Sequence, residues 1–250
     1  MSNLQDAAAL RATPRTFIDL RQFAQDAHQG IVARPSTGED PFLANRRLLD
    51  FPAGPVTAGA LALQAGSGTV SSQPVDEFII VSEGTLTLTQ QGRTLVLGPQ
   101  DSAVIQHGAA FAWSAEGPVS VIFMRYHDSQ PEKRAIVPIA KNPEMGPSGG
   151  PAAELLLTPA PACRNHTDHV SSDGVFICGT WDSTPYHRRA MTYRIYELMY
   201  LLEGSVTFVD ETGRSATFSR GDIFIVEQGV QCSWESREKV AKVYAIYRPA

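Results

Sequence analysis

Cysteine, positive charge and long hydrophobic runs are all scarce in this sequence of 250 residues. Its three cysteines form neither a CxxC pair nor a disulfide ladder, so we expect reduced thiols in a cytoplasmic protein. The formal net charge of −5 provides no basic surface for DNA or RNA. No apolar run reaches the roughly 18 residues that a membrane span needs, and the start, MSNLQDAAALRATPR, lacks the apolar segment of a secretory signal. We therefore expect neither nucleic acid nor membrane as a partner.

Helical periodicity is also rare. Only FIDLRQFAQDA, at residues 17–27, predicts a helix, of about three turns. Elsewhere the pattern is one of short strands between glycine turns: GTLTLTQQGRTLVLG alternates Thr with Leu, and SVTFVDETGRSATF repeats the arrangement later in the chain. Such a pattern is typical of an all-β sandwich or barrel.

The chain contains two copies of one unit. DEFIIVSEG at 76–84 and YELMYLLEG at 196–204 each place one glutamate, Glu77 or Glu197, in an otherwise apolar strand that ends at a glycine. After a gap of one residue the register continues, and so many coincidences in one order indicate a repeat. The further matches pair Gly92-Arg93 with Gly213-Arg214, Asp101 with Asp222, Gly108 with Gly229, and Trp113 with Trp234.

These repeats divide the chain into four parts. We predict an N-terminal extension over 1–50, a first barrel over 51–135, a linker over 136–175 and a second barrel over 176–250. The linker is rich in Pro and Gly, which predicts an irregular connection. Within it, IVPIA at 136–140 is a candidate strand that either barrel could receive.

The order of these features, E-x6-G, a hairpin, G-D-x6-G and a tryptophan strand, resembles the cupin family. Two copies make the chain similar to a bicupin, with two tandem double-stranded β-helix (jelly-roll) barrels and a short helical segment at the N-terminus. The second copy most resembles the subgroup of ureidoglycine aminohydrolase and the ethanolamine-utilisation protein Q. The resemblance covers about residues 55–126 and 176–248.

In metal-binding cupins the glutamate joins three histidines around a divalent metal. The resemblance places the histidine positions of the second copy on Met191 and Tyr193, or on Ala190 and Thr192 with a longer spacing, and then on Cys232. In the first copy they fall on Ser71 and Gln73, or on Val70 and Ser72, and then on Phe111. Because none of these is a histidine, we expect no metal cofactor and read the first barrel as degenerate. Manganese, iron, nickel or zinc bound by Glu197, Cys232 and His187 is the alternative.

Strand alternation predicts what lines the second barrel. If Glu197 faces inward, Met199 shares its face, and under the shorter spacing His187, Arg189, Met191 and Tyr193 also point inward. Under the longer spacing Arg188 and Arg194 replace His187 and Arg189. Cys232 and Trp234 are expected on the opposite wall. The result is an apolar cup with a few polar groups, which is typical of a small-molecule site.

The candidate roles follow from the side-chain chemistry. We assign Glu197 as acid or base, with Tyr193 and His187 donating hydrogen bonds, and Arg189 as the anchor of an anionic group. Met191, Met199, Cys232 and Trp234 complete the predicted ligand-binding set. The alternative for Glu197 is a buried carboxylate that Arg189 or backbone groups satisfy, without any chemical role.

Two other places are weaker candidates. The matching interior of the first barrel is predicted to hold Thr69, Ser71, Gln73, Glu77, Ile79, Phe111 and Trp113, a set that suggests a structural role. His166 and His169, in CRNHTDH, have H-x-x-H spacing but lie in the predicted linker, where we expect a solvated loop.

The sequence therefore predicts a small-molecule-binding protein, either a metal-independent enzyme for a small acidic or nitrogen-containing metabolite or a non-catalytic ligand-binding or regulatory protein. A metalloenzyme with an unusual ligand set is the third hypothesis. Because YELMYLL is apolar on both faces, we also predict a homodimer or a tight pairing of the two repeats.

Overall fold

A computed structural model describes residues 15–33 and 40–249, so the first 14 residues of the predicted extension lie outside the described part. The described chain forms two compact β units. The first contains residues 20–33, 40–138 and 171–173, and the second contains residues 15–19, 139–170 and 174–249. No helix among the described residues is long and apolar enough to cross a membrane.

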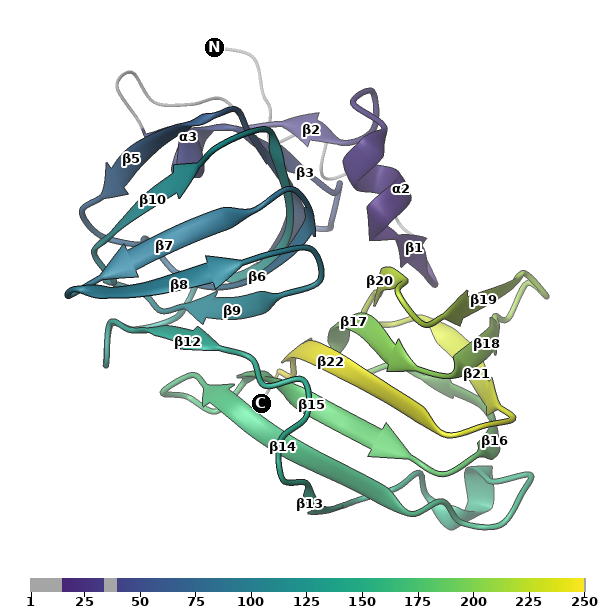
Figure 1. Cartoon of the computed structure of the whole chain (residues 1–250). Coiled ribbons are helices and arrows are strands. Elements are labelled where there is room, and N and C mark those ends of the chain that lie inside the picture. The colour runs from purple at the N-terminus through teal and green to yellow at the C-terminus, as the bar shows by residue number, and fades with distance from the viewer. Residues whose placement is uncertain (1–14, 34–39, 250) are drawn as a thin grey trace. The chain divides into compact units, whose positions relative to one another are not determined.

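Each unit is a pair of antiparallel sheets (Figure 1). In the first unit the seven-stranded sheet has the order β12 (Ile136–Pro138), β9 (Ser102–Ile105), β6 (Asp76–Glu83), β11 (Val119–Tyr126), β4 (Val56–Leu63), β3 (Arg46–Leu48) and β2 (Ile31–Val32). Its four-stranded sheet has the order β5 (Gly66–Val70), β10 (Phe111–Ala115), β7 (Leu86–Gln90) and β8 (Arg93–Leu97).

The second unit repeats this plan. Its seven-stranded sheet has the order β1 (Ile18–Asp19), β20 (Ile223–Val226), β17 (Tyr196–Glu203), β22 (Val240–Tyr247), β15 (Phe176–Ser183), β14 (Cys163–Val170) and β13 (Gly146–Ser148). Its four-stranded sheet has the order β16 (Tyr186–Thr192), β21 (Gln231–Ser236), β18 (Ser205–Val209) and β19 (Ser215–Ser219). The predicted pair of tandem jelly-roll barrels is confirmed.

The glycine that ends each glutamate strand has a geometric reason. Gly84 and Gly204 have φ values of 78° and 76°, a region that L residues rarely adopt. A Cβ at Gly84 would also collide with the carbonyl oxygen of Pro118, and one at Gly204 with that of Lys239. The repeated glycine therefore lets the chain turn tightly against a neighbouring strand in both barrels.

The edge strand beside β9 and β20 comes from a different part of the chain in each unit. In the first unit β12 pairs with β9, so the candidate strand at 136–140 joins the first barrel. In the second unit β1 pairs with β20, so residues just before the first barrel complete the second. The predicted N-terminal helix is accordingly shorter, because β1 takes its start and only α2 (Leu20–Gln25) is helical.

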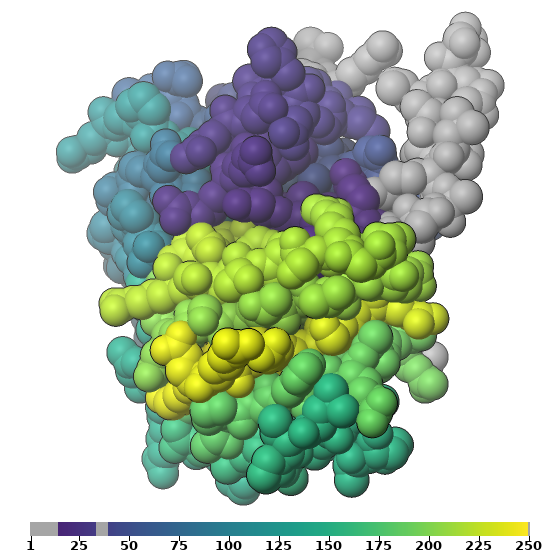
Figure 2. Space-filling view, turned by 90° about the vertical axis from the view of Figure 1, so that its right-hand side faces the viewer, coloured from purple at the N-terminus to yellow at the C-terminus, as the bar shows by residue number. Residues whose placement is uncertain are grey.

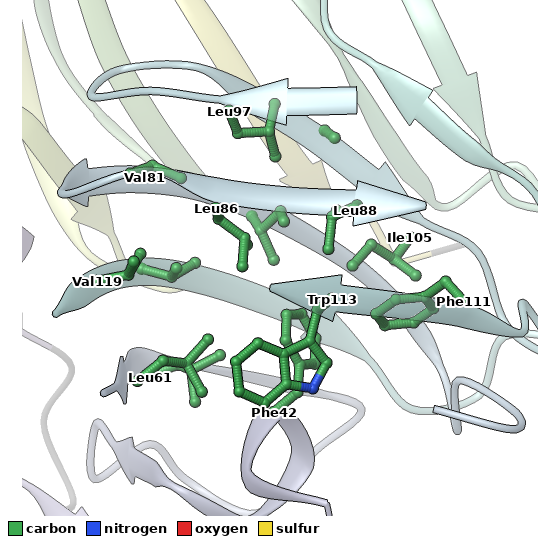
Figure 3. Close-up of a cluster of buried hydrophobic side chains, with 14 of the residues drawn as sticks. Phe42, Leu61, Val81, Leu86, Leu88, Leu97, Ile105, Phe111, Trp113 and Val119 are labelled. Carbon is green, nitrogen blue, oxygen red and sulfur yellow. The ribbon is translucent and has the colours of Figure 1, made fainter. Parts of the chain in front are cut away.

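The first barrel is filled by its own side chains and by one short helix. The helix α3 (Pro41–Ala44) begins at Asp40, whose carboxylate accepts hydrogen bonds from the backbone N–H of Phe42 at 2.8 Å and from Trp113 Nε1 at 2.7 Å. Phe42 is fully buried and meets the Phe111 ring edge-on at 5.2 Å (Figure 3). These contacts anchor an apolar plug in the barrel core.

One detail of the predicted interior of the first barrel is wrong. Thr69 and Ser71 are exposed, whereas Val70 is buried. The register explains this, because Val70 is paired with Phe111 and therefore shares its inward face.

The second barrel has an aromatic core at the end away from β13. Phe17, next to β1, is 2% exposed and packs near Phe208 and Phe218 with ring centroids 6.1 and 6.2 Å away. Arg15 beside it donates from Nε to the fully buried Glu227 at 2.9 Å. Figure 2 views this unit from the side where β18 and β19, coloured lime, cover the surface.

Part of the predicted linker is a regular strand of the second barrel. β14 pairs with β15 along its length, although its sequence, CRNHTDHV, shows no apolar alternation. The reason is that its inward residues, Cys163, Asn165 and Thr167, line a cavity with polar groups rather than an apolar core. The side chains of β14 alternate between the inner and outer faces, but the sequence pattern does not show it because polar residues occupy both faces.

Candidate functional site

The glutamate of the first barrel is enclosed by cations. Glu77 is fully buried, and Arg46 contacts it through Nη1 at 2.5 Å and Nη2 at 3.1 Å. Arg125 Nε lies 3.2 Å from the same carboxylate, and Gln73 donates a hydrogen bond to it at 2.6 Å. Burial alone raises the pKa of the Glu77 carboxyl, but the two guanidinium groups outweigh it and hold that pKa below its ordinary value. This carboxylate serves the structure of the barrel.

The second barrel, in contrast, encloses a cavity of about 630 Å³. Both of its sheets contribute walls, and the loop after β13 contributes glycines. Such a concave, largely apolar space with a few polar groups is typical of a small-molecule site. The polar, charged, aromatic and sulfur-containing side chains that line it include Asn165, Trp181, Tyr186, Arg188, Met191, Tyr193, Arg194, Glu197, Trp234, Lys242, Tyr244 and Arg248.

Glu197 faces this cavity and is paired with a lysine. Its Oε1 accepts a hydrogen bond from Lys242 Nζ at 2.8 Å, and each side chain is only 7% exposed. Lys242 also donates to Met199 Sδ at 3.3 Å and lies 4.7 and 5.0 Å from the ring centroids of Trp181 and Trp234. A buried charge persists when it is paired and hydrogen-bonded, and Lys242 supplies that partner.

The inward arginine is Arg188, and the prediction of Arg189 at this place is wrong. Arg188 is 4% exposed and lines the cavity, whereas Arg189 is exposed and does not. A β-bulge is the cause: Arg188 pairs with Trp234 and Met191 with Cys232, so three steps along β16 match two along β21. Arg188 therefore faces inward as the longer spacing predicts, whereas Met191 and Tyr193, beyond the bulge, face inward as the shorter spacing predicts.

The bulge also moves His187 away from the cavity, contrary to the prediction. His187 pairs with Glu235 on the outer face of the sheet, and its backbone N–H donates to Thr158 Oγ1 at 2.9 Å. Its backbone oxygen accepts from Leu157 N at 2.8 Å. His187 is thus placed to hold the preceding loop rather than a ligand.

Arg188 is held in the wall without an acidic partner. Its Nη1 donates to the carbonyl oxygen of Cys232 at 2.8 Å and to that of Arg189 at 3.2 Å. Its guanidinium carbon lies 5.5 Å from the Tyr193 ring centroid. Among the residues that the structure describes, no carboxylate forms an ion pair with it. Its hydrogen bonds to backbone carbonyl oxygens therefore fix the direction of the guanidinium, and no described residue neutralises its charge.

Aromatic side chains form much of the remaining wall. Tyr186 stacks on Trp234 with centroids 5.6 Å apart, and Trp181 meets Trp234 edge-on at 6.0 Å. Burial raises the pKa of the Tyr186 phenol, and burial together with the charge of Glu197 raises that of Tyr193. Both phenols therefore remain protonated hydrogen-bond donors near neutral pH.

The remaining predicted ligand-binding residues divide into two groups. Met191 and Trp234 line the cavity, as does Tyr193. Met199 and Cys232 are fully buried in the core behind the wall and do not line it. Met199 acts there through its sulfur contact with Lys242, and Cys232 through its backbone oxygen.

The H-x-x-H pair does not form a joint site. Both histidines lie on β14, where a bulge between Thr167 and His169 changes the register. His169 is 5% exposed, whereas His166 lies 3.4 Å from Asp168 on the partly exposed face. The expected solvated loop is a strand.

The donor set around Glu197 does not fit the metal of metal-binding cupins. Lys242 brings a cation to within 2.8 Å of the Glu197 carboxylate, and the histidine positions are occupied by Met191, Tyr193 and Cys232. Burial raises the pKa of the Cys232 thiol to about 11, so it is protonated and a poor ligand. Within the described ranges, no three His, Cys, Asp or Glu side chains are grouped to hold a metal.

The sequence interpretation missed the partner of Glu197, although a usable signal was present. Lys242 is the single charged residue in the apolar strand VAKVYAIY, which is the same kind of signal that identified Glu197. Tyr244 and Ile246 share its inward face by alternation. Trp181 lies on β15 and Tyr186 on β16, and neither strand contains one of the motifs that relate the two copies of the repeat.

Comparison with known proteins supports this architecture. Residues 170–244 match the family model of the EutQ-like cupin domain. A crystal structure of a DUF861-family protein of unknown function from Pseudomonas syringae pv. tomato is 28% identical, covers 94% of this chain and all of its own, and has a TM-score of 0.84. None of the curated proteins matches this chain in sequence.

More distant structures share the fold alone. The Escherichia coli protein Ylba is 14% identical over all of this chain and 99% of its own, with a TM-score of 0.53. A cupin 2 conserved barrel domain protein from Leptotrichia buccalis is 8% identical over 96% of this chain and all of its own, with a TM-score of 0.58.

Proposed function

Because the chain is a member of the cupin superfamily with a cavity in its second barrel, we propose that this barrel binds a small organic anion without a metal. Arg188 holds the carboxylate of that anion. The single observation that carries the proposal is a guanidinium that lines the cavity, is 4% exposed and has no acidic partner among the described residues.

The charge of the cavity supports an anion. Four cationic side chains line it, Arg188, Arg194, Lys242 and Arg248, against the one carboxylate of Glu197. A buried charge is costly unless it is paired, so a ligand carboxylate at Arg188 would neutralise a buried guanidinium that has no acidic partner among the described residues. The planar fork of arginine can hold both oxygens of a carboxylate, which gives direction as well as charge.

The chain offers a matched control for this test. Arg188→Gln removes the cavity charge, and Arg189→Gln removes the same charge from the exposed neighbour. Isothermal titration calorimetry against a panel of small carboxylic acids measures the affinity of each protein. We expect Arg188→Gln to weaken binding by about 30-fold or more, which corresponds to about 2 kcal/mol, with Arg189→Gln near the wild type. Equal effects of the two substitutions would contradict the proposal.

An enzyme for a small acidic or nitrogen-containing metabolite is the second candidate. It is favoured by Glu197 and Tyr193 sharing the cavity, but the ion pair with Lys242 accounts for the buried carboxylate without catalysis. Turnover of a bound acid that falls about 100-fold or more in Glu197→Gln, with binding retained, supports acid or base catalysis. A bound acid that is never turned over supports the non-catalytic form.

A further inference from the structure

Lys242 has bonding capacity that the protein does not use. An ammonium group has three N–H donors. Two of them have partners in the structure, Glu197 Oε1 at 2.8 Å and Met199 Sδ at 3.3 Å. Lys242 also lines the cavity, with the rings of Trp181 and Trp234 on its flanks. One donor of a fixed cation is therefore left for a ligand atom.

Lys242 and Arg188 reach the cavity from different sheets. Arg188 is on β16 of the four-stranded sheet, and Lys242 is on β22 of the seven-stranded sheet. Trp234 neighbours both cations: its ring centroid is 5.0 Å from Lys242 Nζ, and Arg188 is its partner on the adjacent strand. Tyr186 stacks on the same indole at 5.6 Å, so a ligand that contacts both cations lies beside aromatic carbon.

We infer that the ligand is a small dicarboxylate with a flat apolar spacer, one carboxylate held by Arg188 and the other by Lys242. This inference rests on the proposed function and narrows it to a dianion. Burial supports it: of the four cationic side chains at the cavity, Arg188 and Lys242 are the two buried ones, 4% and 6% exposed, and a charge held away from water gains most from a carboxylate. Glu197 then keeps the ammonium in place while the ligand takes the free donor.

The test compares acids that differ only in the second carboxylate. Benzoate and terephthalate are one such pair, and hexanoate and adipate are a flexible pair. We expect the wild type to bind the dicarboxylate at least 10-fold more tightly than the monocarboxylate in calorimetric titrations. Equal affinity for both members of a pair would overturn the inference. If Arg188→Gln still abolished binding in that case, the proposed binding of a single carboxylate by Arg188 would remain supported. Binding of neither acid class would count against both.

A double substitution assigns the second anchor. Lys242→Met with Glu197→Gln removes both charges, so no unpaired carboxylate is left in the core. We expect this protein to bind the monocarboxylate as the wild type does, and to lose the preference for the dicarboxylate. A preference that survives would place the second carboxylate at Arg194 or Arg248 and overturn the assignment. If the double variant fails to fold, as judged by circular dichroism, the comparison in the wild type decides the inference by itself.

Discussion

Glu77 and Glu197 occupy equivalent positions on β6 and β17, and each is held by basic side chains of its own barrel. Arg46 and Arg125 surround Glu77, whereas among the described residues Lys242 forms the ion pair with Glu197. The two arginines belong to β3 and β11, and the lysine belongs to β22. The two equivalent carboxylates are therefore neutralised by different partners. Two arginines surround Glu77 in the filled first barrel, and a lysine pairs with Glu197 beside the cavity of the second.

The Glu77 cluster predicts a pH-dependent stability. Its folded-state pKa lies below the ordinary value of 4.5, so the stabilisation is fully present above pH 4.5 and is lost as the pH falls through the folded-state pKa. At neutral pH, Glu77→Gln removes the carboxylate that neutralises Arg46 and Arg125, which costs about 3–5 kcal/mol. Urea unfolding of both proteins at neutral and acidic pH measures the difference. It should shrink as the pH drops below 4.5; a constant difference would contradict this account.

At the scale of elements, regular patterns made the fold predictable and local irregularities hid parts of the site. Alternating strands, repeated glycines and the two glutamates were sufficient for a repeated all-β sandwich or barrel, and the resemblance to cupins specified two tandem jelly-roll barrels. These patterns did not predict the bulge after Arg188. One extra residue there changes which side chains face inward, and the hydrophobic pattern of the sequence does not reveal it. β14 was missed because its inward face is polar. Both failures lie at the cavity, where function rather than core packing decides the residue types.

The plug helix α3 yields a prediction about the first barrel. Phe42 is fully buried against Phe111 and the indole of Trp113, so Phe42→Ala removes a large apolar side chain from a packed core. We expect a loss of about 3–5 kcal/mol in the free energy of unfolding. Chemical denaturation followed by tryptophan fluorescence measures it.

The neighbouring substitution Leu43→Ala provides the control, since Leu43 is only partly buried at the same core. It should cost clearly less than Phe42→Ala. Equal costs would indicate that the helix as a whole, and not the inserted phenyl ring, stabilises the barrel.

At the scale of the whole molecule, the two barrels differ in their interiors. The cavity is lined by residues of the second unit alone, and the first unit has a filled core. The tandem repeat thus pairs a barrel suited to a structural role with one suited to binding.

The homodimer predicted from β17 is a separate proposal at this scale. Its support is the general prevalence of symmetric dimers. The outer residues Leu198 and Tyr200 of β17 are already buried within the chain, at 0% and 4% exposed, so this strand does not supply the dimer surface. Size-exclusion chromatography with light scattering should give about twice the chain mass of 27.1 kDa. A single species at the chain mass would exclude the dimer.

The central proposal is that Lys242 pairs with Glu197 at the place where metal-binding cupins hold a metal. Elemental mass spectrometry tests it most directly, on protein purified without a histidine tag and without added metal. The account predicts manganese, iron, nickel and zinc all well below one equivalent per chain, because Lys242 already pairs with Glu197 and no histidine stands at the ligand positions. Near-stoichiometric content of any of these metals, lost in Glu197→Gln, would contradict it.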